Sequence, residues 1–172
     1  ESPHECARLV RDSLISGTSL FRARETFETL GRTHLPAMLE GRGKDEEFRI
    51  WVPGCSTGQE AYTLGILVLE ALERMDVAPR VAIFGSDIDE DALRIARQGR
   101  YPNSIADEVP EDLLMKYFRS RQGGYEVTTQ LRDLVRFSNQ SLTRDPPFAR
   151  IDLVSCRNVL IYFDNALQKH AH

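Results

Sequence analysis

Glycine and a carboxylate stand where two apolar runs end, and residues of these types at strand ends can bind a ligand. Gly54 and Gly58 follow the run at 48–52, and Asp87 follows the run at 80–86. Glycine lets a ligand approach the backbone, while a carboxylate accepts hydrogen bonds from hydroxyl groups. Because successive strands of a βαβ unit are parallel and end at the same edge, these residues predict a shared site at that edge.

The loop between the first predicted strand and a helix beginning at Gln59 narrows the choice of ligand. A dinucleotide fingerprint needs three glycines in the order G-x-G-x-x-G, whereas Gly54 and Gly58 are separated by three residues and no third glycine follows. No Gly-Lys-Ser/Thr follows either, which excludes a P-loop. The loop therefore suits an adenosyl ligand without a phosphate bridge. The alternative is that both glycines serve turn geometry alone.

Asp87 and Asp89 lie two residues apart but are predicted to have different roles. Asp89 suits the N-cap of a helix whose first turn carries Glu90 and Asp91, and Gly99 suits the end of that helix. Asp87 is left at the end of the second strand, where a carboxylate can accept both hydroxyls of an adenosine ribose. A loop or capping role for Asp87 stays open.

Further polar side chains lie at element junctions, each with a structural alternative. Arg22 follows an aromatic residue, and its guanidinium can meet a carboxylate or simply face solvent. Tyr162 follows the last predicted strand, near the cleft between the first and last strands, where a buried core position is the alternative. The amide and hydroxyl groups of residues 139–141, which include Ser141, can read an adenine edge or cap a turn.

The pattern of apolar residues predicts an α/β fold with a mostly parallel sheet. Strands are expected at 48–52, 80–86 and 151–155, because each is a short, nearly continuous apolar run. A helix is expected at 59–75, where apolar residues recur at helical spacing. Strand, glycine loop and helix together make the first half of a nucleotide-type βαβ unit.

Other elements are expected around this centre. One helix is predicted at 5–15, and a second, further along, is predicted to end at Gly31. A helix is expected to start at Pro110. Residues 125–127 and 134–137 are expected to pair as a small β-hairpin, which is an available docking surface for a partner chain.

The composition is that of one globular domain. The chain has 172 residues, 41% of them hydrophobic and 28% charged, and a net charge of −4 that gives no reason to expect nucleic acid as a partner. Cys6, Cys55 and Cys156 form no C-x-x-C pair and the four histidines show no metal spacing, so neither disulfides nor a metal site are expected. No run is long enough for membrane insertion and no leader is seen, so a cytoplasmic location is expected.

Three motifs in register carry a resemblance to a known family. They are Cys-Ser-Thr-Gly-Gln-Glu-Ala-Tyr at 55–62, Ser-Asp-Ile-Asp at 86–89 and Cys-Arg-Asn-Val-Leu-Ile-Tyr-Phe at 156–163. From about Thr18 to its end, the chain resembles the CheR family of S-adenosylmethionine-dependent chemoreceptor glutamate O-methyltransferases. Pro-Gly-Cys before the first motif and Asp-Pro-Pro-Phe before the last strand look most like methyltransferase domains fused to methylesterase and sensor-kinase modules.

The resemblance implies a methyl donor, an acceptor and a set of site residues. S-adenosylmethionine would be the donor and S-adenosylhomocysteine the product, and a chemoreceptor or other signalling protein would carry the acceptor glutamate. By position, the family's donor contacts fall on Thr18, Arg22, Glu60, Asp87, Leu142, Arg157 and Asn158, with Gly54, Gly58 and Ser141 beside them in the loops. Arg22 and Tyr162 would act as catalytic residues next to the transferred methyl group.

The resemblance also implies how the chain is divided. Residues 1–47 would form an N-terminal helical segment and linker, and residues 48–172 a partial S-adenosylmethionine-binding domain with a hairpin subdomain at about 123–137. The implied fold is Rossmann-like and truncated on its C-terminal side. Two other functions stay open: a non-catalytic donor-binding or docking module of a larger signalling protein, and a nicotinamide-dependent oxidoreductase, which the glycine spacing disfavours.

Overall fold

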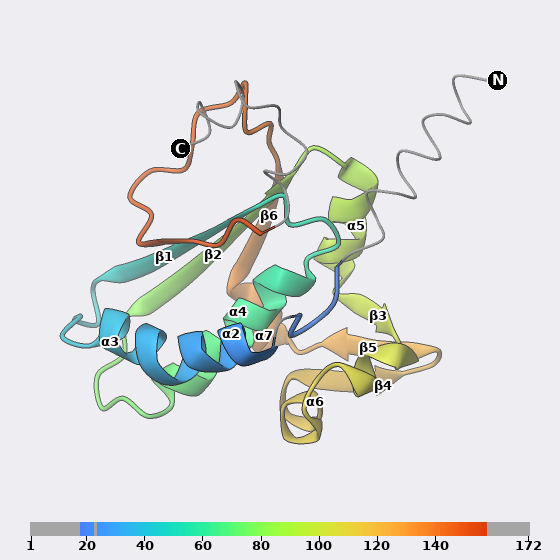
Figure 1. Cartoon of the computed structure of the whole chain (residues 1–172), viewed down its shortest axis with the longest axis horizontal. Coiled ribbons are helices and arrows are strands. Elements are labelled where there is room, and N and C mark those ends of the chain that lie inside the picture. Colours follow the sequence, from blue (N-terminus) through green and yellow to red (C-terminus); the bar gives the residue numbers. More distant parts are fainter. Residues whose placement is uncertain (1–17, 23, 158–172) are drawn as a thin grey trace.

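The structure is a computed structural model that describes residues 18–22 and 24–157, and a parallel β-sheet forms its centre (Figure 1). The strand order is β6-β2-β1-β7, with β1 (Glu47–Pro53), β2 (Arg80–Asp87), β6 (Val135–Asn139) and β7 (Leu153–Val154). All three neighbouring pairs are parallel. The chain moves from β1 to β2 and β6 on one side, then returns to β7 on the other. Ligands of open α/β sheets bind where the strand order reverses in this way.

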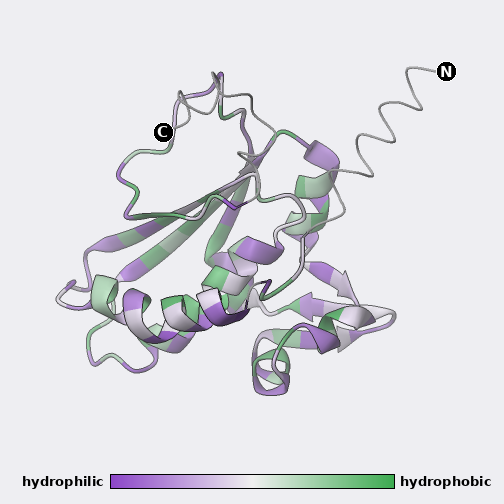
Figure 2. Ribbon diagram, viewed as in Figure 1, coloured by the Kyte–Doolittle hydropathy of each residue, from purple (hydrophilic) through white to green (hydrophobic). Residues whose placement is uncertain are grey.

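The central strands β1 and β2 confirm the strands predicted at 48–52 and 80–86. Phe48, Ile50 and Val52 of β1 are almost completely buried and alternate with partly exposed residues. Figure 2 shows hydrophobic and hydrophilic residues alternating along the central strands. The last predicted strand, 151–155, is shorter in the structure. Its backbone still bonds to β1 on both sides of β7, because Asp152 N donates to Arg49 O at 2.9 Å and Ser155 N donates to Trp51 O at 2.8 Å.

Helix α4 (Gln59–Leu72) connects β1 to β2 and confirms the helix predicted at 59–75, although it ends three residues earlier. Nine of its residues are buried, since it contacts β2 and β6 as well as the neighbouring helices α3 (Leu35–Leu39) and α7 (Thr129–Asp133). The first turn of α4 is thereby fixed at the carboxyl end of β1.

The helices before β1 differ from the prediction. Helix α2 (Arg24–Thr29) continues through a π-helical stretch, η1 (Leu30–His34), into α3, so the predicted stop at Gly31 is wrong. A Cβ atom at Gly31 would lie 2.9 Å from Leu67 Cδ2, so glycine here permits close packing against α4 rather than ending a helix. The helix predicted at 5–15 lies outside the described residues.

Helix α5 (Glu90–Gln98) begins and ends as predicted. The Asp89 side chain accepts hydrogen bonds from the backbone of Asp91 and Ala92, which makes it the N-cap. Gly99 ends the helix with a φ of 61°, in the left-handed conformation that glycine adopts easily.

A small antiparallel sheet, of order β3-β5-β4, stands apart from the parallel one in Figure 1. Its strands are β3 (Arg100–Pro102), β4 (Phe118–Arg121) and β5 (Gly124–Val127), with η2 (Asn103–Asp107) and α6 (Glu111–Tyr117) between β3 and β4. The predicted pairing of 125–127 with 134–137 is wrong, because β5 pairs with β3 and β4. The second half of that predicted hairpin enters the main sheet as β6, after the short helix α7.

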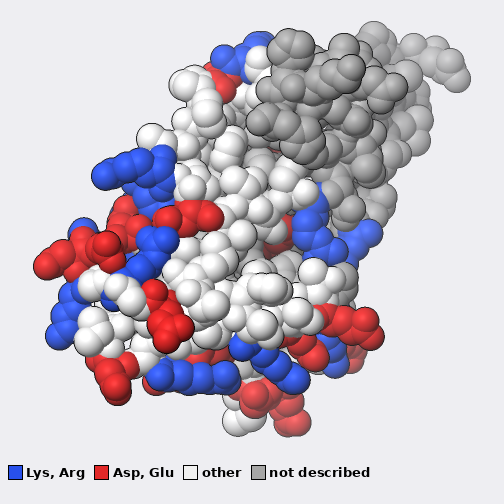
Figure 3. Space-filling view, turned by 60° about the vertical axis from the view of Figure 1, so that its left-hand side comes forward, with Lys and Arg blue, Asp and Glu red and all other residues white. Residues whose placement is uncertain are grey.

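Charge on the surface is mixed in sign. Figure 3 shows basic and acidic side chains interleaved over the face that it presents. Within the described ranges, every helix is too short or too polar to span a bilayer, and no cluster of histidine, cysteine or acidic residues could hold a metal ion.

Candidate functional site

The loop between β1 and α4 lies at the carboxyl edge of the sheet and has an unusual backbone. Gly54, Ser56 and Gly58 all have positive φ, at 64°, 49° and 88°. A Cβ atom at Gly58 would lie 2.9 Å from both Ala96 Cβ and Phe137 Cζ, so packing requires this glycine in addition to its φ. Ser56 carries a Cβ atom, so its positive φ is strained. A non-glycine residue in this conformation is stable only where its surroundings hold it.

Asp87, at the end of β2, holds Ser56 in place. Its Oδ2 accepts a hydrogen bond from Ser56 N at 2.7 Å, and its Oδ1 accepts one from Asp89 N at 3.0 Å. Asp87 therefore faces the glycine loop and serves the structure as well. Each carboxylate oxygen keeps a further lone pair, so both can still accept from a pair of hydroxyl groups.

Glu60, in the first turn of α4, meets the end of β7. Ser155 Oγ donates a hydrogen bond of 2.5 Å to Glu60 Oε1. Burial raises the pKa of Glu60 above its usual range, while the hydrogen bond from Ser155 and the charges of Arg157 and Arg22 oppose that rise. The site thus contains a half-buried carboxylate with two arginines close enough to stabilise its ionised form.

The segment before α2 reaches the same edge. Thr18 Oγ1 lies 3.4 Å from Thr57 Oγ1 in the glycine loop. Arg157 Nη1 donates to the backbone oxygen of Arg22 at 3.0 Å, and the guanidinium of Arg157 lies 5.1 Å from the ring centroid of Phe27. Thr18, Arg22 and Arg157, distant in the sequence, are therefore brought together at the carboxyl ends of β1 and β7.

Residues after β6 form the far side of the site. Gln140 N donates to Asp87 O at 3.0 Å, which places the following residues, Ser141 and Leu142, beyond the end of β2. Ser141 is engaged in its own turn, because its backbone N donates to Asp145 Oδ2 at 2.7 Å and its Oγ lies 3.2 Å from Thr143 Oγ1. The turn-capping alternative for Ser141 is thus realised. Its predicted contact with an adenine edge stays a prediction.

Ile88 is a residue at this edge that was not singled out from the sequence. It follows Asp87, its side chain is 69% exposed, and its carbonyl oxygen accepts from Asn139 Nδ2 at 3.0 Å. An exposed apolar side chain beside the Asp87 carboxylate, for which a ribose is predicted as ligand, offers a surface against the flat face of a base. The sequence feature that could have indicated Ile88 is its position, as an apolar residue between Asp87 and Asp89 directly after a predicted strand.

Two of the predicted site residues, Asn158 and Tyr162, lie outside the described residues. The predicted residues that the structure does describe, apart from Ser141 and Leu142 on the far side, surround the loop from Gly54 to Gly58.

The two described cysteines, Cys55 and Cys156, are poor nucleophiles. Burial raises the pKa of both thiols. The Asp87 and Glu60 carboxylates raise the pKa of Cys55 further, and Glu60 does the same for Cys156. The thiolate is the reactive form, so neither cysteine is suited to covalent catalysis at neutral pH. Cys55 is buried and Cys156 partly buried, as small apolar residues of a protein interior are.

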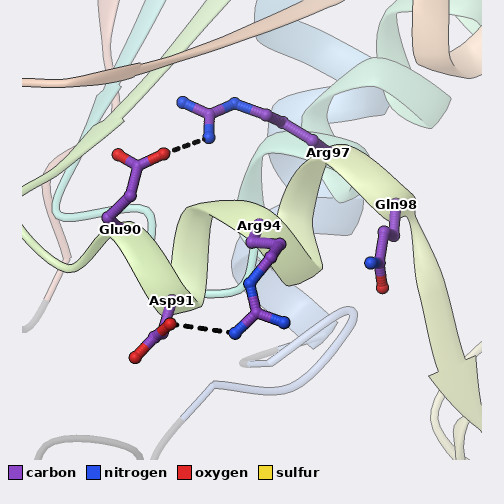
Figure 4. Close-up of a pocket in the computed structure, with 5 residues that line it drawn as sticks. All are labelled: Glu90, Asp91, Arg94, Arg97 and Gln98. Carbon is purple, nitrogen blue, oxygen red and sulfur yellow. Dashed lines mark hydrogen bonds and ion pairs between the residues drawn. The ribbon is translucent and has the colours of Figure 1, made fainter.

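A hollow on the outer surface of α5 is lined by Glu90, Asp91, Arg94, Arg97 and Gln98 (Figure 4). Glu90 pairs with Arg97 at 2.5 Å, and Asp91 pairs with Arg94 at 2.9 Å. Since the charged groups of this hollow already pair with one another within one helix, they are less available to bind a ligand than the polar groups at the strand ends.

Comparison with known proteins identifies the family. The CheR methyltransferase, SAM binding domain, matches residues 16–171. A chemotaxis protein methyltransferase of Borreliella burgdorferi is 36% identical over 152 residues, which cover 86% of this chain and 54% of that protein. Chemotaxis protein methyltransferase 2 of Pseudomonas aeruginosa is 36% identical over 157 residues, covering 88% of this chain and 54% of that protein.

A third relative is much longer. An uncharacterized 104.1 kDa protein of Rhodobacter capsulatus is 36% identical over 167 residues, which cover 97% of this chain and 18% of that protein. The chain therefore spans about half the length of the two chemotaxis methyltransferases and less than a fifth of the third protein. With a family match over most of its length, this chain belongs to the CheR methyltransferase family, within its S-adenosylmethionine-binding domain.

Proposed function

We propose that the protein transfers a methyl group from S-adenosylmethionine to a glutamate side chain of a chemoreceptor or other signalling protein in the cytoplasm. The observation that carries this proposal is the convergence of two carboxylates, Asp87 and Glu60, with Arg22 and Arg157 around the glycine loop. The names of the chemotaxis relatives support the class of acceptor. Fusion to methylesterase and sensor-kinase domains is part of the same proposal.

The described residues fit an adenosyl donor. Asp87 offers two carboxylate oxygens to a ribose, and Ile88 offers an apolar surface to a base. The amide of Gln140 is oriented by Nε2 donating to Pro146 O at 2.6 Å, which leaves Oε1 buried and without a donor among the described residues. The adenine amino group could supply that donor. Glu60 supplies negative charge for the cationic amino-acid end of the donor.

The reaction asks for positioning rather than for a strong base. The donor supplies an electrophilic sulfonium methyl group, and an acceptor glutamate, with a pKa of about 4.3, is already ionised at neutral pH. In our proposal Arg22 holds the acceptor carboxylate, Tyr162 orients it, and Asp87 and Glu60 fix the donor. Alignment of two bound reactants can lower the barrier by several kcal/mol.

The proposed function is tested by methyl transfer itself. With radiolabelled S-adenosylmethionine and a cytoplasmic chemoreceptor fragment, we expect base-labile label on the receptor, and less label when its acceptor glutamates are changed to alanine. Titration calorimetry should show binding of S-adenosylhomocysteine and none of NAD. Donor binding without any transfer would favour the non-catalytic module instead.

Donor binding is expected to weaken as the pH falls, because of Glu60. Since burial raises the pKa of Glu60, its carboxylate takes up a proton at a pH above the usual value of about 4.3 and then no longer attracts a cation. Calorimetry with S-adenosylhomocysteine from neutral to acidic pH should show this loss. Ser155→Ala should move its midpoint to higher pH, because the hydrogen bond from Ser155 favours the ionised form.

The matched control for this pH dependence is Glu60→Gln, which keeps the size of the side chain. This variant should bind weakly at neutral pH and show a flatter profile. An unchanged midpoint in Glu60→Gln would assign the pH dependence to another group.

A further inference from the structure

The backbone before Arg22 is held by two hydrogen bonds to side chains that are distant in the sequence. Leu20 N donates to Glu108 Oε2 at 2.8 Å, across 88 residues of sequence. Phe21 N donates to Thr63 Oγ1 of α4 at 3.1 Å. Two consecutive amides are therefore fixed by side chains of distant elements, which leaves this short stretch little freedom to move.

Phe21 has a conformation that needs such support. Its φ of 53° is in the left-handed region, which is strained for a non-glycine residue and persists only where the surroundings hold it. The side chains of Leu20 and Phe21 are 2% and 7% exposed, so both are anchored in the core. The turn at Phe21 sets the direction in which the chain leaves the core, and Arg22 is the first residue after it.

Arg22 therefore depends on this turn for its place in the site. Its side chain is exposed, its backbone oxygen accepts from Arg157, and its charge acts on Glu60. A guanidinium at the start of a flexible stretch would sample many positions. A guanidinium directly after two fixed amides samples fewer, at a lower entropic cost of holding an acceptor.

Glu108 belongs to the connection between β3 and α6, in the part of the chain that carries the small sheet. The same part also supports the glycine loop, because Tyr101 of β3 donates from its hydroxyl to Thr57 O at 2.8 Å. Arg24 Nη2 lies 3.4 Å from the backbone oxygen of Glu108, which adds a contact to the start of α2. The part of the chain that carries the small sheet therefore contacts both the segment before α2 and the glycine loop of the candidate site.

We propose that Glu108 is a positioning residue, which fixes the turn at Leu20 and Phe21 so that Arg22 is directed at the acceptor carboxylate. This inference rests on the proposed function. A carboxylate accepting from a backbone amide forms a charge-assisted bond, and its removal leaves the Leu20 amide without that acceptor. The segment can then relax from its strained conformation and carry Arg22 away. Displacements of about 1 Å can cost about 100-fold in rate.

The test compares Glu108→Ala, Glu108→Gln and the matched control Glu111→Ala, which removes an exposed glutamate from α6. Glu108→Ala should lower kcat about 10-fold or more, while the affinity for S-adenosylhomocysteine changes by no more than about 3-fold. Hydrogen exchange followed by mass spectrometry should show faster exchange confined to residues 18–22. Glu108→Gln keeps an oxygen acceptor and should restore most of the kcat and most of the exchange protection at 18–22. Glu111→Ala should behave as wild type.

Three results would overturn the positioning role. They are unchanged exchange at 18–22 in Glu108→Ala, faster exchange there with unchanged kcat, and a loss of exchange protection spread over the whole domain, which marks a general structural role. Absence of methyl transfer by the wild-type protein would contradict the proposed function alone. Exchange at 18–22 would then still decide whether Glu108 holds the turn, and unchanged exchange in Glu108→Ala would refute it.

Discussion

Asp87→Ala is expected to lower the affinity for S-adenosylhomocysteine by about 100-fold or more, the largest loss of binding that we expect from a single substitution. The two Asp87 oxygens would accept both ribose hydroxyls, and charge-assisted hydrogen bonds contribute about 1.5 kcal/mol or more each. The same substitution removes the acceptor for Ser56 N, so the glycine loop also loses the bond that holds its left-handed residue. Titration calorimetry at neutral pH measures the change directly.

Asp89→Ala is the matched control, since Asp89 is also an aspartate and lies two residues after the end of β2. Its side chain caps α5, so its loss should cost about 1 kcal/mol of stability and leave ligand affinity nearly unchanged. Asp87→Asn keeps one oxygen acceptor and should bind better than Asp87→Ala. Similar affinity of the Asp87→Ala and Asp89→Ala variants would show that Asp87 serves the loop and not the ligand.

The parts of the fold that follow from local chemistry could be predicted. The burial pattern of β1, the N-cap at Asp89 and the glycine at the end of α5 each depend on neighbouring residues. The pairing of β5 could not be predicted in this way. Strands 118–121 and 135–139 both lie near it in sequence, and only tertiary packing decides that β6 joins the main sheet.

The candidate site, like the fold, has residues that local sequence predicts and contacts that only tertiary packing determines. The glycine loop and Asp87 could be predicted because each ends a recognisable strand, and Arg22 was a candidate from its place at an element junction. The family resemblance added Thr18, Glu60 and Arg157. The contacts from Ser155 to Glu60 and from Glu108 to Leu20 span 95 and 88 residues and leave no pattern in one sequence. Residues that position a site from a distance are therefore found only in the folded chain.

Arg22→Ala is expected to lower kcat for methyl transfer by about 100- to 1,000-fold, because the acceptor carboxylate then loses the charged group that holds it in line. The affinity for S-adenosylhomocysteine should change by only a few-fold, since Asp87 and the glycine loop remain in place. Single-turnover assays with saturating donor separate the two quantities. Arg22→Lys should give an intermediate rate, because an ammonium keeps the charge but lacks the two-pronged geometry of guanidinium.

Arg32→Ala is the control for this prediction. Arg32 lies in η1, its side chain is 77% exposed, and it pairs with Glu28 one turn earlier at 3.8 Å. Its removal should leave both rate and affinity at the wild-type level, so any general effect of losing a cation from this helical region would be seen there. If Arg22→Ala instead lost donor affinity as strongly as it lost rate, Arg22 would belong to the donor site. The acceptor carboxylate would then need another cation, and Arg157, bonded to the Arg22 backbone, would be the next residue to test.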